Sequence, residues 1–109
     1  MTIRNLTPHP IVIEIPSGER VTFPPEGIIP RVSSKVAPCG EFLGVPLSET
    51  VFGEVEGLPE AEEGTILIVS GFVLDRVRES RPDVFRPDTG QDCIRNEKGQ
   101  IVAVRRLTR

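Results

Sequence analysis

The sequence predicts an α+β fold in which a mainly antiparallel sheet of short strands is accompanied by one short helix. Eleven prolines and ten glycines interrupt the 109 residues so often that long helices are not expected. Short runs of β-branched or alternating apolar residues lie between these breaks, and helical spacing occurs in only one segment. Because a chain of this length forms one hydrophobic core, we expect a single domain over residues 1–109.

Turn residues between two β-branched runs predict a hairpin near the N-terminus. Ile11–Ile15 is an extended run, Pro16–Glu19 contains the residues of a turn, and Arg20–Phe23 follows as the second strand. Beyond a further turn, residues 28–36 are expected to be extended. Pro30 confines that piece to a sheet edge or an irregular strand, because proline donates no hydrogen bond to a neighbouring strand.

The middle of the chain predicts short strands and a loop. Residues 41–55 are rich in apolar side chains but are interrupted by glycine and proline, so we expect two short strands with a bend between them. An acidic loop is expected over residues 57–64. Thr65–Val69 combines β-branched and apolar residues between a glycine and a serine, which is typical of a buried strand.

A single helix is predicted to follow this strand. Ser70 is a suitable N-cap, and the Arg81-Pro82 pair ends the helix after about ten residues. The C-terminal tail predicts a hairpin, with residues 92–95 and 100–107 on either side of a turn at 96–99. The apolar face of the helix is formed by residues at helical spacing, which are Val69, Phe72, Val73 and Val77.

Composition and charge exclude several classes of function. The formal net charge is −3, whereas proteins that coat long nucleic acids carry a basic excess, so no such partner is expected. No apolar run approaches the roughly 20 residues that span a bilayer, and the N-terminal residues show no signal-peptide pattern. We therefore expect a soluble cytoplasmic protein without a membrane partner. Cys39 and Cys93 are isolated from one another and are predicted to be free thiols.

Charge is distributed unevenly along the chain, and arginine dominates its basic half. Residues 1–64 carry a net charge of −6, residues 65–109 carry +3, and eleven of the thirteen cations are arginine. The planar guanidinium suits phosphate or carboxylate, so Arg86, Arg95 and Arg105 are candidate phosphate ligands. The alternative is a solvated surface on which arginines pair with the many glutamates.

The junction at Ser70 and Gly71 is a candidate anion site. A buried strand leads into a helix here, and the first helical amides point outward with the positive end of the helix dipole. Gly71 permits close approach, and Ser70 offers a hydroxyl. The sequence contains no complete phosphate-loop motif, and the alternative is a serine cap followed by a packed glycine.

The only histidine, His9, lies between Pro8 and Pro10, which hold the chain extended. Asn5, Thr7 and His9 alternate along this segment, so an extended backbone projects all three to one side, where they can hydrogen-bond a base, a ribose or an amide. In the alternative interpretation, Asn5 and Thr7 satisfy the backbone of the loop.

Several motifs give the chain a resemblance to a known family. The chain resembles a family of small bacteriophage and prophage proteins of undescribed function, through Asn5-Leu6-Thr7-Pro8-His9, residues 53–59, residues 81–84 and residues 94–102. It departs from the family at Asn96, which takes an aspartate position, and at Val104, which precedes Arg105 where the family has cysteine. The resemblance implies the cytoplasm of an infected bacterium, where one class of small phage proteins sequesters nucleotide second messengers.

The leading hypothesis is a non-catalytic protein that binds and sequesters a small phosphorylated nucleotide. Ser70, Gly71 and nearby arginines would hold the phosphate, and the segment from Asn5 to His9 would hold the base or ribose. No cofactor is expected, and a homo-oligomer would give more room for such a ligand than one small sheet does.

Two alternatives belong to other classes of function. In a hydrolase of the same ligands, His9 acts as general acid or base, and Glu54 or Glu56 orients water or a metal. These two glutamates lack further metal-ligating neighbours, so we interpret them as an exposed strand face. In a protein-interaction module, a virion component or an inhibitor of a host enzyme docks through residues 54–63 or an exposed sheet edge.

Overall fold

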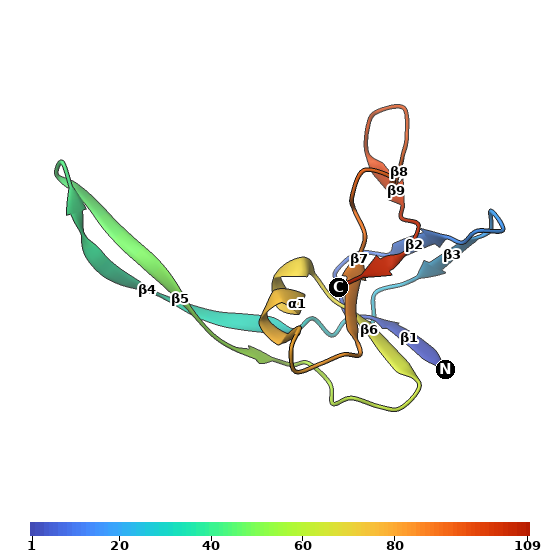
Figure 1. Cartoon of the computed structure of the whole chain (residues 1–109), viewed down its shortest axis with the longest axis horizontal. Helices are drawn as coiled ribbons and strands as arrows, with labels where there is room; N and C mark the ends of the chain where they lie inside the picture. Colours follow the sequence, from blue (N-terminus) through green and yellow to red (C-terminus); the bar gives the residue numbers. More distant parts are fainter.

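A mixed four-stranded sheet forms the centre of the molecule, in the order β1-β6-β7-β10. The computed structural model describes residues 1–109 (Figure 1). Both β1 and β7 run parallel to β6, and β10 runs antiparallel to β7. The four strands are β1 (Thr2–Asn5), β6 (Thr65–Ile68), β7 (Val84–Pro87) and β10 (Leu107–Thr108).

The mixed sheet corrects part of the predicted fold class. The protein is mostly strand with one short helix, which fits α+β loosely, but it has no single large antiparallel sheet. The parallel pairing of β6 with β7 follows from the helix between them, because a crossover helix returns the chain to start the next strand in the same direction.

Three antiparallel hairpins surround the central sheet. The predicted N-terminal hairpin is confirmed as β2 (Ile11–Glu14) and β3 (Arg20–Phe23), and the predicted tail hairpin as the shorter β8 (Ile94–Arg95) and β9 (Ile101–Ala103). Leu107, predicted to extend that tail hairpin, instead pairs with Pro87 in the central sheet.

The third hairpin differs from the prediction for the middle of the chain. Instead of two short strands over 41–55, β4 (Arg31–Phe42) and β5 (Val45–Glu56) pair along twelve residues each, around a turn at Leu43 and Gly44. Proline and glycine do not end these strands, because both strands of a two-stranded ribbon have a free edge and the register shifts at two irregularities. In Figure 1 this hairpin extends away from the rest of the molecule.

The single helix, α1 (Gly71–Val77), is shorter than the predicted ten residues. Ser70 is confirmed as its N-cap, since the Ser70 hydroxyl oxygen accepts a hydrogen bond from the Val73 amide at 3.3 Å. The helix ends at Val77 and is followed by a turn, in which the Val77 carbonyl accepts hydrogen bonds from the amides of Ser80 and Arg81 and from the Ser80 hydroxyl. No helix is long and apolar enough to cross a membrane.

The core lies between α1 and the sheet and is small. Only 13 of the 109 residues are buried. The margins of the core are formed by four partly buried apolar side chains, which are Val32, Val55, Leu58 and Val77. Both cysteines are free. The core cluster itself consists of six side chains from the first loop, β6, the segment between β6 and α1, α1 and β7, namely Leu6, Leu67, Val69, Val73, Leu74 and Val84.

Candidate functional site

The carboxyl ends of β1, β6 and β7 meet at one edge of the central sheet. The register places Asn5 beside Ile68 and Ile68 beside Phe85, so the segments that follow these three residues are neighbours. Because β10 runs antiparallel to β7, its first residues lie at this edge as well. Ligands of sheets with parallel strands bind in the crevice outside such carboxyl ends. We call this region the carboxyl edge; it brings together the segments that contain His9, Ser70, Gly71, Arg86 and Arg105.

Asn5 and Thr7 are buried there and are hydrogen-bonded within the protein. Asn5 Nδ2 donates to the carbonyl oxygens of His9 and Phe23, each at 2.8 Å. Asn5 Oδ1 accepts from the Thr7 amide at 2.9 Å and from the Thr7 hydroxyl at 2.7 Å. Asn5 is 1% exposed and Thr7 is 8% exposed. The two side chains therefore satisfy the loop backbone, which was the alternative interpretation, and they fix the loop rather than face a ligand.

His9 differs from these two residues because its side chain is exposed. Its backbone carbonyl is held by Asn5 Nδ2, and the Thr7 hydroxyl lies 3.0 Å from the same oxygen. The imidazole forms no hydrogen bond within the protein. The loop thus holds the His9 backbone in place while leaving both ring nitrogens free for a ligand.

The helix terminus alone does not supply an anion site. α1 has only seven residues, and one of its first amides is already bonded to the Ser70 hydroxyl oxygen. The Ser70 side chain is exposed, and its hydroxyl hydrogen remains able to donate. An anion site at this junction would therefore need a neighbouring cation.

Arg86 provides this cation. It lies on β7 two residues after the buried Val84 and therefore on the same face of the sheet, toward α1. A Cβ atom at position 71 would come within 3.3 Å of Arg86 Cδ, so Gly71 leaves room for the arginine stem. Arg86 is half-buried, and its guanidinium forms no ion pair or hydrogen bond within the protein.

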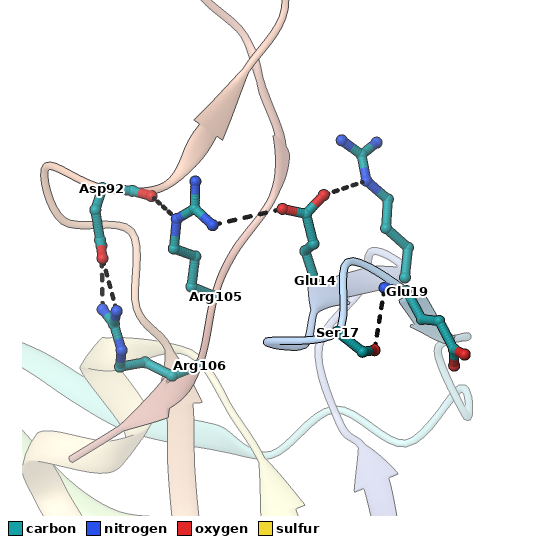
Figure 2. Close-up of polar contacts among 7 residues, drawn as sticks. Glu14, Ser17, Glu19, Asp92, Arg105 and Arg106 are labelled. Carbon is teal, nitrogen blue, oxygen red and sulfur yellow. Dashed lines mark hydrogen bonds and ion pairs between the residues drawn. The ribbon is translucent and has the colours of Figure 1, made fainter.

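The other two predicted arginines have partners within the protein. Arg105 Nε donates to the Asp92 carbonyl oxygen at 2.9 Å, and Arg105 Nη1 lies 3.4 Å from a carboxylate oxygen of Glu14 (Figure 2). Arg95 Nη1 donates to the Gly99 carbonyl oxygen at 2.6 Å, inside the β8–β9 hairpin. Arg105 lies at the carboxyl edge but is engaged, and Arg95 stabilises its own hairpin.

A cluster around Arg106 was not predicted from the sequence. Arg106 pairs with Asp88 at 2.8 Å and, as Figure 2 shows, with Asp92 at 2.6 Å. The hydrogen bonds from Arg106 hold the pKa of both carboxyls below the usual range. Asp88 also accepts from the Gly90 amide, and this Asp-Thr-Gly turn is the one sequence signal that could have indicated the cluster.

The glutamates considered for the hydrolase lie at the base of the β4–β5 hairpin. Glu54 and Glu56 are both exposed, in agreement with their interpretation as a strand face. Glu54 borders a shallow hollow with Arg76 and Arg81. No group of three or more metal-ligating side chains occurs in the structure.

One surface hollow is bordered by the predicted site residue Arg105, and it does not include His9, Ser70 or Arg86. The hollow that includes a predicted site residue has a volume of about 280 Å³ and lies between the β2–β3 turn and the arginine pair, lined by Glu14, Ile15, Pro16, Gly18, Arg105 and Arg106. Comparison with protein-family models, with curated proteins and with solved structures finds no match to this chain.

Proposed function

We propose that this protein binds a small phosphorylated nucleotide without transforming it, and that Arg86 is the principal phosphate ligand. The observation that carries the proposal is a half-buried guanidinium without an anionic partner at the carboxyl edge. By contrast, six other arginines pair with carboxylates, namely Arg4, Arg20, Arg78, Arg81, Arg105 and Arg106.

The surroundings of Arg86 suit a phosphate. Gly71 leaves room for the Arg86 stem, Ser70 offers an exposed hydroxyl, and a guanidinium can bond two phosphate oxygens at once. His9 lies on the neighbouring segment with both ring nitrogens free, which suits a base or ribose. Asn5 and Thr7 act indirectly in this proposal, since they hold the backbone of the His9 loop.

The overall charge favours a small ligand over a polymer. A net charge of −3 repels a long polyanion, whereas one unpaired arginine is sufficient for one or two phosphates. The resemblance to phage and prophage proteins extends the proposal to a signalling nucleotide of an infected bacterium, which the protein would sequester.

Isothermal titration calorimetry tests the proposal against a panel of cyclic dinucleotides and ADP-ribose derivatives. We expect at least one member to bind, and Arg86→Gln to weaken its affinity about tenfold or more, because hydrogen bonds to charged groups contribute about 1.5–3 kcal/mol. Arg31→Gln is the matched control, since Arg31 also lacks an ion pair and the charge change is the same. No heat with any member, while circular dichroism shows a folded protein, would refute the proposal.

Product analysis separates the binder from the hydrolase. We expect chromatography to recover the bound ligand intact after incubation with the protein. Conversion of the ligand that is lost in His9→Ala would instead establish the hydrolase and overturn the non-catalytic assignment.

A further inference from the structure

The β4–β5 hairpin forms an arm that the chain itself does not cover. Of residues 31–56, only Val32, Ala37 and Val55 are even partly buried. Contact with the body is confined to the base, where Phe52 meets Phe72 edge-on at 5.0 Å and Arg76 lies over the Phe52 ring at 4.4 Å. An isolated two-stranded ribbon is at best marginally stable in water.

One face of the arm is more apolar than the other. Residues paired directly across an antiparallel ribbon project to the same side, so the pairs Phe42 with Val45, Gly40 with Leu47, Ala37 with Glu49 and Lys35 with Val51 share one face. In its outer part this face presents Ala37, Phe42, Val45, Leu47 and Val51. Its only charges there are Lys35 and Glu49, which balance one another. The opposite face presents Glu41, Ser48 and Thr50 together with three apolar residues, Val36, Pro38 and Pro46.

The tip of the arm is apolar and strained. Leu43 has φ 52° and Gly44 has φ 82°, so both residues of the turn are left-handed. Asn-Gly is the favoured pair for such a turn, and a leucine there costs about 1–2 kcal/mol. Leu43 is nevertheless 89% exposed. An exposed leucine side chain at this position gains no free energy that would offset the strain of the turn, whereas its burial against another surface would offset that strain.

The surface area of the chain is consistent with a missing partner. The accessible area is 7669 Å², whereas a compact monomer of this mass exposes about 6,000 Å². The Cα radius of gyration is 17.3 Å, against about 13 Å for a compact domain of this length. The excess, about 1,700 Å², falls within the roughly 1,000–2,500 Å² that each subunit of an obligate homodimer buries.

We propose that a second copy of this chain covers the apolar face and tip of the arm. Symmetric pairs are the commonest oligomers, and in them the same patch of each copy meets. Two copies of this face can meet without net electrostatic repulsion, because each copy contributes one lysine, Lys35, and one glutamate, Glu49. The proposal is independent of the nucleotide site, since neither Arg86 nor His9 belongs to the arm.

Sedimentation equilibrium of the full chain at about 1–100 µM tests this interface. We expect a mass of at least twice 12.0 kDa for the natural sequence. Leu47→Lys should shift the mass to that of a single chain and raise the dissociation constant at least tenfold. Ser48→Lys is the matched control, because it introduces the same charge one residue away on the opposite face, and it should leave the mass unchanged. A single-chain mass for the natural sequence throughout this range would overturn the proposal, and so would equal effects of the two variants.

Leu43→Asn tests the tip of the arm with a variant that should remain folded. It introduces the residue that the turn prefers, so far-UV circular dichroism should be unchanged while association weakens. A nitroxide on Cys39, in a chain carrying Cys93→Ser, should show a dipolar coupling between labels that disappears with Leu47→Lys. Unchanged association in Leu43→Asn together with no dipolar coupling would contradict the proposed face.

Discussion

Asn5→Ala should destabilise the protein strongly, although a single polar side chain is removed. Asn5 connects three segments, because it bonds its own loop at Thr7 and His9 and also reaches the Phe23 carbonyl at the end of β3. If Asn5 instead served only to contact a ligand, its removal would leave stability unchanged and reduce binding alone.

The size of the effect follows from the groups that lose their partners. The buried Thr7 amide and the Phe23 carbonyl are left without the bonds that Asn5 makes. The His9 carbonyl can still accept from the Thr7 hydroxyl. Each unpaired buried group costs about 1–3 kcal/mol, so the expected loss is about 3 kcal/mol. The total free energy of unfolding of a chain this long is roughly 5–15 kcal/mol.

Urea denaturation followed by far-UV circular dichroism measures this loss, because the chain has neither tryptophan nor tyrosine for fluorescence. Asn96→Ala is the control. Asn96 makes similar bonds to Lys98 and Gln100, but it is exposed, so water replaces them and the loss should stay below about 1 kcal/mol. Equal losses at the two positions would refute the assignment of Asn5 as a structural residue.

Three further predictions concern stability. A hydrogen bond from Arg81 lowers the pKa of Asp83. The ionised Asp83 carboxylate therefore stabilises the folded state at pH values above the pKa that Asp83 has in the unfolded chain, and the free energy of unfolding falls as the pH drops below about 4. Asp83→Asn should flatten this fall, and an unchanged acid profile would contradict the prediction. Leu74→Ala should lose about 2–5 kcal/mol in urea denaturation, because Leu74 is fully buried, and a loss below about 1 kcal/mol would count against the core described above. Ser70→Ala should lose about 1 kcal/mol through the missing cap; a midpoint equal to that of the natural sequence would show that the cap is dispensable.

Local signals were sufficient for some elements and not for others. The β2–β3 hairpin, β6 and the Ser70 cap were predicted correctly, because turn residues, β-branched runs and cap chemistry act within a few residues. The parallel pairing of β1 with β6 joins segments about sixty residues apart, and no local pattern encodes it. The arm was divided wrongly because Pro38 and Pro46 usually end strands, whereas a ribbon with two free edges accommodates both.

The candidate site shows the same division between local and distant information. The sequence located the His9 loop and the Ser70-Gly71 junction, which depend on adjacent residues. It did not show that the Asn5 side-chain amide donates to the Phe23 carbonyl oxygen, since that hydrogen bond links residues 18 positions apart. Nor does composition reveal which arginines lack a carboxylate partner, because Arg86 and Arg105 differ only in the carboxylates that the fold places near them.

The most direct test of the carboxyl edge as a nucleotide site is ¹⁵N NMR during titration with the cyclic dinucleotides and ADP-ribose derivatives of the calorimetric panel. We expect the Ser70 and Gly71 amide signals and the Arg86 Nε signal to shift together and to saturate with one ligand per chain. Shifts confined to the arm, or an unperturbed spectrum of the folded protein with every compound, would contradict the proposed site.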